Sequence, residues 1–293
     1  MKKKLCVLAA FTLVAATVFA QQVFDYLKDS LDNVLEMSAT IRITDYEYKD
    51  GGALWGTYLE PGKTLSSSSQ FDGGVEYIII AAAHSTRINV DLKVYEGNGT
   101  NGTVVFRDIA PDATPVARFT PETSGLYSFE LINSSNSPAF ISLIVLKHKR
   151  NANFTLSALT QAVNNIPYLA DAISRMLPPG AEIPANKWTL FGGSVNRGTY
   201  TRNYNVQLSR GAYFLTGAGE NSVNNLDAEV IEQRAENIQE GRIISTNSGK
   251  SSLIDYGTFE PNSSRYYNLK IINISSARSS AFMFGFLILT VKY

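Results

Sequence analysis

The sequence predicts a mainly β protein built from two tandem antiparallel β-sandwich modules of jelly-roll-like type, each preceded by an amphipathic helix. Three observations support this prediction. The chain of 293 residues contains 15 Tyr and 15 Phe, and aromatic residues favour the half-buried surfaces of strands. Short apolar segments are separated by turns rich in Gly, Asn and Ser. Similar segments also recur in the same order later in the chain, which indicates a duplicated unit.

Residues 1–20 have the features of a secretory signal peptide. The basic start Lys2–Lys4 precedes the apolar run Leu5–Phe19, and Val18 and Ala20 lie three positions and one position before the expected cleavage point. The run is shorter than the roughly 20 residues that a membrane-spanning helix needs. We therefore expect an exported chain with no transmembrane span after cleavage. The alternative is an uncleaved N-terminal anchor.

The charge and cysteine content of the expected mature chain exclude several classes of protein. Cleavage removes three Lys from a chain with 26 basic and 26 acidic side chains, which leaves a net charge of about −3. This charge does not favour binding to nucleic acid. The single cysteine, Cys6, belongs to the signal peptide, so we expect no disulfide framework.

Residues 21–50 are predicted to form a helix followed by a lead-in to the first module. Phe24, Leu27, Leu31 and Val34 recur at the spacing of one helix face. Such an apolar stripe is expected to dock on a sandwich or on a second helix.

The first module is predicted over residues 51–150 because its segments recur later in the chain. The segment Leu54–Gly62 aligns with Leu190–Gly198. The same spacing along the chain aligns Tyr77–Glu96 with Tyr213–Glu232 without a gap. Two collinear matches of this length predict that both segments belong to a repeated fold unit.

A second block of similarity extends the repeat toward its end. Phe119–Asn133 aligns with Phe259–Asn273, at a slightly larger spacing than the first block. A final strand follows in each copy, starting at Phe140 and at Phe282. Because these strands are apolar on both faces, we expect each to lie in the centre of a sheet.

The linker over residues 151–185 is predicted to be helical, and the second module covers residues 186–293. The linker carries a helical apolar stripe interrupted at Pro167 and ended by Pro178–Gly180. The stripe consists of Leu156, Leu159, Val163, Ile166, Leu169, Ile173, Met176 and Leu177.

The first module resembles the bacterial pre-peptidase C-terminal (PPC) domain. The resemblance rests on an Asp-Leu-x-Val-Tyr strand at Asp91–Tyr95 and on a Thr-x-x-x-Ser-Gly-x-Tyr corner at Thr120–Tyr127. The second copy is divergent, because Arg265 replaces the corner Gly and Leu226–Ala228 replaces the start of the strand. The resemblance implies an accessory β-sandwich that binds a substrate, a matrix or a cell surface.

The corner residues also have a physical explanation. Gly125 is expected to supply a positive φ and to allow close approach of strands. Tyr127 is expected to bury its ring while its hydroxyl reaches a backbone acceptor, as in a tyrosine corner.

Candidate site residues are few. Trp55, Tyr58 and Trp188 are candidate ligand-binding aromatics, although Trp55 is also interpreted as a core residue. No catalytic motif is present: the two histidines, His84 and His148, have no nucleophile turn beside them.

No cofactor is expected, apart from a calcium ion as the one metal hypothesis. Ca²⁺ binds several carboxylate and carbonyl oxygens. Asp91, Asp108 and Asp112 could supply them if they converge at one end of the sandwich.

We interpret the protein as an exported, non-catalytic binding or structural protein of the periplasm, envelope or cell surface, with a polysaccharide or protein partner. One alternative is an outer-membrane β-rich component, suggested by the apolar last strand and the terminal Tyr293. The other is a secreted hydrolase with an unrecognised site, for which Asp91 with Asp108, or Asp227 with Glu229, are the carboxylate candidates.

Overall fold

The computed structural model describes most of the chain after the predicted signal peptide. The described residues are 24–41, 45–50, 52–150, 152, 156–168, 181–182, 188–208, 210–233, 241–247, 249, 251, 253–260 and 265–292. The predicted signal peptide and the second part of the linker stripe, from Leu169 to Leu177, lie outside them.

The predicted fold class is confirmed: the chain is mainly β and its strands pair antiparallel in two sheets. The ten-stranded sheet contains, in spatial order, β16 (Leu253–Phe259), β13 (Ala212–Gly219), β18 (Ser280–Lys292), β11 (Trp188–Asn196), β2 (Leu54–Leu59), β9 (Ala139–His148), β4 (Tyr77–Ala83) and β7 (Val116–Phe119), with β1 (Tyr46–Tyr48) beside β9 and β10 (Ala181–Glu182) beside β18. The eight-stranded sheet contains β15 (Gly241–Asn247), β14 (Val223–Gln233), β17 (Arg265–Ser276), β12 (Tyr200–Leu208), β3 (Thr64–Phe71), β8 (Gly125–Asn133), β5 (Val90–Glu96) and β6 (Val104–Asp108).

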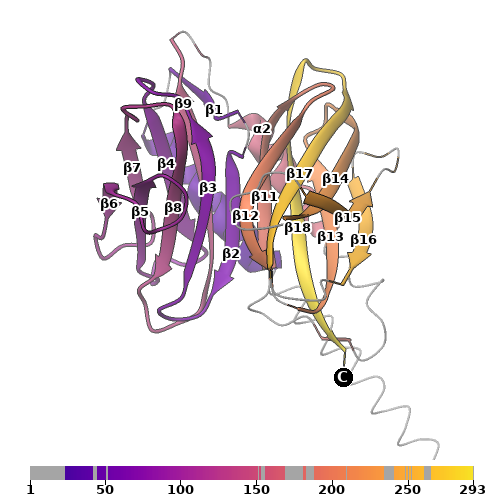
Figure 1. The fold of residues 1–293 in the computed structure, drawn as a ribbon, viewed down its shortest axis with the longest axis horizontal. Coiled ribbons are helices and arrows are strands. Elements are labelled where there is room, and N and C mark those ends of the chain that lie inside the picture. Colours follow the sequence, from indigo (N-terminus) through magenta and orange to yellow (C-terminus); the bar gives the residue numbers. More distant parts are fainter. Residues whose placement is uncertain are drawn as a thin grey trace, which may run out of the picture.

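The strand order of the first half, residues 54–148, recurs in the second half, residues 188–292. The order β2-β9-β4-β7 corresponds to β11-β18-β13-β16, and β3-β8-β5-β6 corresponds to β12-β17-β14-β15. Both sheets run continuously through the two halves, which lie side by side in Figure 1. The boundaries of two separate modules therefore stay a prediction, whereas the sheets themselves are shared. The last strand of each half lies inside its sheet, as the sequence predicted.

The two halves meet through strands that correspond to one another in the repeat. In the ten-stranded sheet, β2 pairs with β11 and Trp55 lies opposite Phe191. In the eight-stranded sheet, β3 pairs with β12 and Ser68 lies opposite Tyr204. The members of each pair occupy matching positions in the repeat. An approximate two-fold axis therefore passes between the halves, as in a self-complementary dimer interface.

One apolar core fills the space between the sheets along their whole length. It includes Trp55, Phe129 and Ile79 from the first half and Phe191 and Leu269 from the second, all fully buried. A core of this extent stabilises both halves together, because each buried side chain gains roughly 1.5–3 kcal/mol on leaving water.

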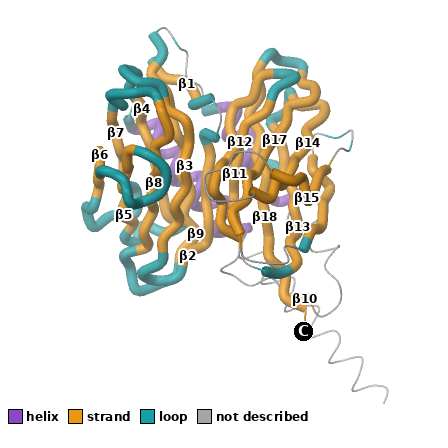
Figure 2. Tube along the Cα trace, in the orientation of Figure 1, coloured by secondary structure: helices purple, strands orange, loops and turns teal. Residues whose placement is uncertain are grey.

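Helices cover the other face of the ten-stranded sheet. A helix over residues 24–40 buries Phe24, Leu27, Leu31 and Val34 against that face. The helix α2 (Ser157–Val163) buries Leu159, Ala162 and Val163 in the same way. In Figure 2 the helices lie behind the strands. Both apolar stripes predicted from the sequence thus dock on the sandwich within the described residues.

The two helices dock at corresponding places. Asn33 donates from Nδ2 to the carbonyl of Ala83 at 2.8 Å, and Asn165 donates to the carbonyl of Gly219 at 2.8 Å. Ala83 and Gly219 are themselves at matching positions of the repeat. The structural correspondence between the halves therefore includes the helix that precedes each set of strands.

Recurring residues at the β2–β3 and β11–β12 turns make the same contacts. Gly62 and Gly198 have φ values of 70° and 78°, in the left-handed region that favours glycine. Their N–H groups donate to the carbonyls of Asn133 at 2.8 Å and Asn273 at 2.7 Å. Each Asn is fully buried and donates from Nδ2, to Leu59 and Val195 respectively, at 2.9 Å. The recurring Asn therefore ties the end of the eight-stranded sheet to the ten-stranded sheet.

The prediction for the corner at Thr120–Tyr127 is partly confirmed. The Tyr127 ring is buried and its hydroxyl donates to the Thr123 carbonyl at 3.2 Å, which confirms the tyrosine corner. The expected positive φ at Gly125 is wrong, because Gly125 is not among the glycines in the left-handed region. A Cβ atom there would meet nothing within 4 Å. Arg265 can therefore take the corresponding position without strain.

We expect Gly192→Ala to lower the free energy of unfolding by about 2 kcal/mol or more, because overpacking strains a well-packed sheet. A Cβ atom at Gly192 would lie 2.3 Å from the Met283 carbonyl oxygen and 2.7 Å from Phe284 Cα. Urea unfolding measures the effect. The matched control is Gly125→Ala, which should change stability by no more than about 1 kcal/mol. Equal effects of the two substitutions would contradict the assigned strand packing.

Candidate ligand groove between the two halves

A groove of about 630 Å³ lies where β1 approaches the second half of the chain. Such a volume is within the usual range of ligand sites. Its lining combines carboxylates, bases, hydroxyls and tyrosine rings from distant parts of the sequence. The lining residues are Tyr46, Glu47, Tyr48, Asp50, Lys149, Ala152, Ala158, Ser194, Asn196, Glu220, Arg278, Ser279, Ser280, Ala281 and Phe282.

The first wall of the groove is β1 with the chain that follows it. β1 pairs with the end of β9, so that Glu47 lies opposite Lys147. The Glu47 carboxylate accepts from Lys149 Nζ at 2.6 Å. The Tyr48 ring packs on Phe282 with a centroid distance of 4.7 Å, which connects this wall to the second half.

The Tyr46 hydroxyl anchors β1 from the other side. It donates to the Glu76 carboxylate. Burial, together with this hydrogen bond and the charge of Glu76, raises the pKa of Tyr46 to about 12. The phenol therefore remains a neutral hydrogen-bond donor at physiological pH.

The second wall contains a buried carboxylate. Glu220 is only 2% exposed and accepts from the Ser222 hydroxyl at 2.5 Å. Arg278, whose side chain is 62% exposed, pairs with it at 3.4 Å. Burial and the charge of Glu220 raise the pKa of Tyr48 above its ordinary value. The groove thus has a fixed carboxylate in its wall and a solvent-exposed guanidinium above it.

The position of Glu220 corresponds to His84 in the first half. The N–H groups of both residues donate to corresponding carbonyls at 2.9 Å, those of Phe140 for His84 and Phe282 for Glu220. In the first half the helix over residues 24–40 covers this place, and Tyr26 packs on His84 with a centroid distance of 4.1 Å. In the second half the corresponding position faces the groove. The two halves therefore differ at the position where the groove forms.

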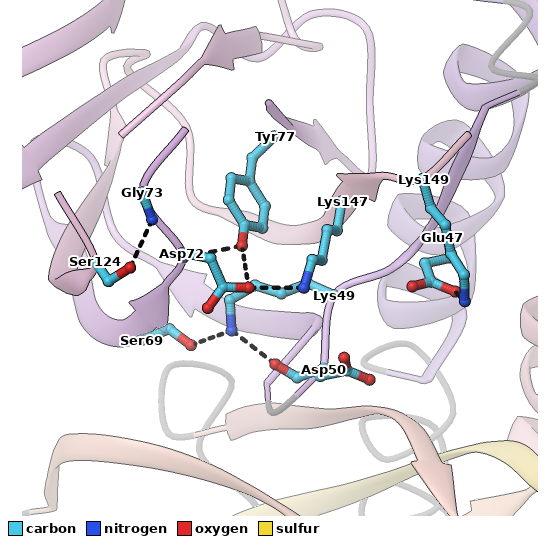
Figure 3. A network of polar contacts seen from close by, with 10 residues as sticks. All are labelled: Glu47, Lys49, Asp50, Ser69, Asp72, Gly73, Tyr77, Ser124, Lys147 and Lys149. Atoms are coloured by element: carbon cyan, nitrogen blue, oxygen red, sulfur yellow. Dashed lines mark hydrogen bonds and ion pairs between the residues drawn. The ribbon is translucent and has the colours of Figure 1, made fainter. Parts of the chain in front are cut away.

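Beside the groove, the Lys49 ammonium contacts Ser69 and Asp50, as Figure 3 shows. The residue is 2% exposed. Its Nζ donates to the Asp50 carbonyl at 2.8 Å and to the Ser69 hydroxyl at 2.8 Å, and lies 5.0 Å from the centre of the Phe71 ring. Desolvation lowers the pKa of Lys49 to about 7, against a smaller opposing effect of Asp50 and Asp72.

Asp72 organises the polar residues next to Lys49. Its carboxylate accepts from Lys147 Nζ at 2.7 Å and from the Tyr77 hydroxyl at 3.3 Å. The hydrogen bond from Lys147 is the main reason that the pKa of Asp72 lies below its ordinary value. This network holds the end of β3 against β4 and β9, beside the wall that carries Glu47 and Lys149.

Of the three aromatic candidates from the sequence, the structure describes the side chains of Trp55 and Tyr58, and both are buried. Trp55 is fully buried and packs edge-on against Phe129 at a centroid distance of 5.3 Å, so its placement fits the core interpretation. Tyr58 is 8% exposed and belongs to the apolar cluster beneath the helices. Trp188 begins β11 and pairs with Ile288, but its side chain lies outside the described residues. Trp55 is therefore not retained as a ligand contact.

The three predicted calcium ligands accept hydrogen bonds at the turns of the first half. Asp91 accepts from the Ser134 hydroxyl at 2.7 Å. Asp108 accepts from the N–H groups of Ala110 and Val116, each at 3.1 Å, and Asp112 accepts from Thr114 at 2.9 Å. In the part of the chain that the structure describes, no group of three His, Cys, Asp or Glu side chains could hold a metal ion.

His84 and the hydrolase candidate Glu229 each have a structural partner, whereas Asp227 Oδ1 is buried without a hydrogen bond to any described residue. The His84 Nδ1 atom accepts from the Phe140 N–H at 3.3 Å, and burial lowers the pKa of His84. Glu229 pairs with Lys270 at 2.8 Å. Burial, with the charge of Glu229, raises the pKa of Asp227.

The sequence alone missed the groove residues because Tyr48, Lys149, Glu220 and Arg278 come from four distant segments. One signal was available: Glu220 and His84 are unlike residues at matching positions of the repeat. Such a difference within an otherwise similar segment indicates where the halves have separate roles.

Comparison with known proteins finds solved structures that are similar to this chain. No family model and no curated protein matches the chain. Similar structures include the PBSX exported protein XepA, 12% identical over 80% of this chain and 84% of that chain, with a TM-score of 0.26. The low-affinity xylan binding module CBM86 from Roseburia intestinalis is 14% identical over 37% of this chain and 86% of that module, with a TM-score of 0.25.

A pre-peptidase C-terminal domain, that of the collagenase from Bacillus anthracis, is also among the similar structures. It is 11% identical over 30% of this chain and 90% of that domain, with a TM-score of 0.21. Similarities at this level carry no inference about ligand or activity.

Within the described ranges, no helix has the length and apolar character that crossing a membrane requires.

We expect Lys49→Met to stabilise the protein more at pH 6.5 than at pH 9. The folded-state pKa of Lys49 is lowered from 10.5 to about 7, so between these values the unfolded state binds more protons and wild-type stability rises with pH. The advantage of the variant should therefore fall by roughly 1 kcal/mol for each pH unit above 7.

Urea unfolding at several pH values measures this dependence. The matched control is Lys149→Met, because the Lys149 side chain is 59% exposed and carries no such desolvation. A pH-independent effect of Lys49→Met would show that the buried amine has an ordinary pKa.

Proposed function

We propose that the protein is an exported, non-catalytic binding protein of the bacterial envelope or cell surface that binds a polysaccharide in the groove between its two halves. The observation that carries the proposal is the composition of the groove wall. Carboxylates, hydroxyls, an amide and two bases line it together with tyrosine rings, and these groups recognise the hydroxyls and ring faces of sugars.

The positioning of these groups supports binding. Glu220 is held by Ser222, and the Tyr48 ring is held by Phe282, so both are fixed before a ligand arrives. Preorganised groups lose little conformational entropy on binding. Arg278 remains largely exposed and can exchange its partial contact with Glu220 for contact with a ligand.

The described lining of the groove does not contain the Ser–His arrangement of a serine hydrolase. Among the described residues that line the groove there is no histidine and no cysteine. Its hydroxyl groups therefore lack an adjacent imidazole base of the kind that activates a serine nucleophile.

Export is proposed from the N-terminal sequence. In a bacterial host we expect the full-length chain to be cleaved after Ala20, because a basic start, an apolar run and small residues form a processing signal. Mass spectrometry of the exported fraction should find a chain that begins at Gln21. A chain that keeps Met1 and remains in the cytoplasm would contradict export.

We expect Arg278→Ala to weaken binding to a cell-wall or matrix polysaccharide by roughly fivefold or more, because arginine is enriched among the residues whose truncation costs more than about 1 kcal/mol of binding free energy. Binding is measured by calorimetry with the mature protein against a panel of such polymers. The matched control is Arg242→Ala, which removes a similarly exposed Arg–Glu pair, at 3.3 Å, outside the groove. Equal binding by the two variants, or no binding of any polymer by the wild type, would contradict the proposal.

A further inference from the structure

The groove wall that carries β1 joins β2 through an irregularity in the ladder with β9. The Lys49 N–H donates to the Val145 carbonyl at 3.0 Å, and the Val145 N–H donates to the Ala53 carbonyl at 2.8 Å. Because both contacts use Val145, the intervening Asp50 and Gly52 leave the ladder, as in a β-bulge. We name Lys49, Asp50 and Gly52 the Lys49 bulge.

β1 and β11 separate at the Lys49 bulge, and the groove lies between them. On one side of the bulge the Ala53 N–H donates to the Gly192 carbonyl of β11, at 2.9 Å. On the other side β1 is three residues long and pairs with β9. Tyr48 of β1 and Ser194 of β11 both line the groove there. The bulge therefore sets the position of the wall that β1 forms.

The Lys49 bulge is attached to the eight-stranded sheet at the junction of the halves. Lys49 Nζ donates to the Ser69 hydroxyl on β3 at 2.8 Å, and the Gly52 N–H donates to the Thr201 hydroxyl on β12. Gly52 has a φ of 80°, and a Cβ atom there would lie 3.2 Å from Asn203 Oδ1. Because β3 pairs with β12, these contacts hold the bulge to both halves at one place.

The attachment depends on an ionisable group, since Lys49 is only 2% exposed. The ionisable groups around it are Asp50 of the bulge, Asp72 after β3, Lys147 of β9 and Tyr77 of β4, which binds Asp72. β12 faces the bulge with Thr201 and Asn203, which carry no charge, and with the Arg202 carbonyl. Desolvation outweighs the surrounding charges and lowers the pKa of Lys49 to about 7.

Proton uptake favours an open bulge, because an ammonium is more stable in water than inside the protein. The pKa of Lys49 is about 7 in the closed structure and has its ordinary value of 10.5 once the side chain is exposed. Between these values the open form binds more protons, so lowering the pH makes opening easier. Opening should become roughly tenfold more frequent for each pH unit from about 10 down to about 7, and should change little below that.

We infer that the Lys49 bulge is a proton-controlled closure of the groove: proton uptake by the buried amine favours detachment of the bulge from β3 and β12 and release of β1 from β9. Glu47 and Tyr48 would leave with β1, so the wall they form belongs to the closed state. A three-residue strand can open locally because few backbone hydrogen bonds hold it. Control of ligand binding by this movement rests on the proposed function, whereas the movement itself does not.

Amide hydrogen exchange of the mature protein without ligand, at pH 7, 8 and 9, tests the inference. The reporters are the Lys49 N–H and the Lys149 N–H, which donates to the Asp45 carbonyl at 2.9 Å. The reference is the His148 N–H, which donates to the Glu76 carbonyl at 2.8 Å. After correction for the intrinsic pH dependence of exchange, opening at the reporters should fall roughly tenfold for each pH unit. The reporters should also open more often than the reference.

Two variants separate the Lys49 amine from other titrating groups. Lys49→Met should make opening at its own amide independent of pH, whereas Lys149→Met should keep the wild-type dependence at the Lys49 amide. The inference is overturned if wild-type opening does not change with pH, if Lys49→Met keeps the dependence, or if the reporters open only together with the reference. Because no ligand is present, a failure of polysaccharide binding in the groove leaves this result unaffected.

Discussion

Antiparallel pairing of β2 with β11 and of β3 with β12 is the constraint on which the rest of the structure depends. A jelly-roll half on its own would present unpaired backbone groups along these strands, and such edges invite aggregation. Pairing satisfies them within one chain, and the Ala53 N–H reaches the Gly192 carbonyl at 2.9 Å. It also merges the interiors of the halves, so that Trp55 and Phe191 share one core.

The same pairing explains why a nearly symmetric scaffold can carry unequal surfaces. The backbone contacts at Asn133 and Asn273, and at Asn33 and Asn165, are equivalent and fix the two halves in the same way. Side chains that these contacts do not use can diverge. Glu220 faces the groove where its counterpart His84 lies under a helix. A repeat held by shared backbone contacts thus supports two different surfaces.

This arrangement buries polar groups near the approximate two-fold axis between the halves, and their desolvation costs folding free energy. Lys49 lies within the protein beside the junction and keeps its hydrogen bonds to Ser69 and Asp50. Satisfied partners limit the desolvation cost of a buried amine but do not remove it. The only cysteine is Cys6, within the predicted signal peptide, so cysteine pairing inside the mature sequence is not available to offset this cost. The continuous core between the sheets supplies the stability instead.

The sequence by itself determined the features that depend on local periodicity and turn chemistry. The helical stripe from Phe24 to Val34, the repeat, the central last strands and the tyrosine corner at Tyr127 all follow from residue spacing, because neighbouring positions decide which side chains share a face. Gly125 was misjudged because local pattern does not specify φ. Tertiary structure alone decided that the halves share sheets and that Tyr48, Glu220 and Arg278 meet, because those contacts join segments that only strand pairing brings together.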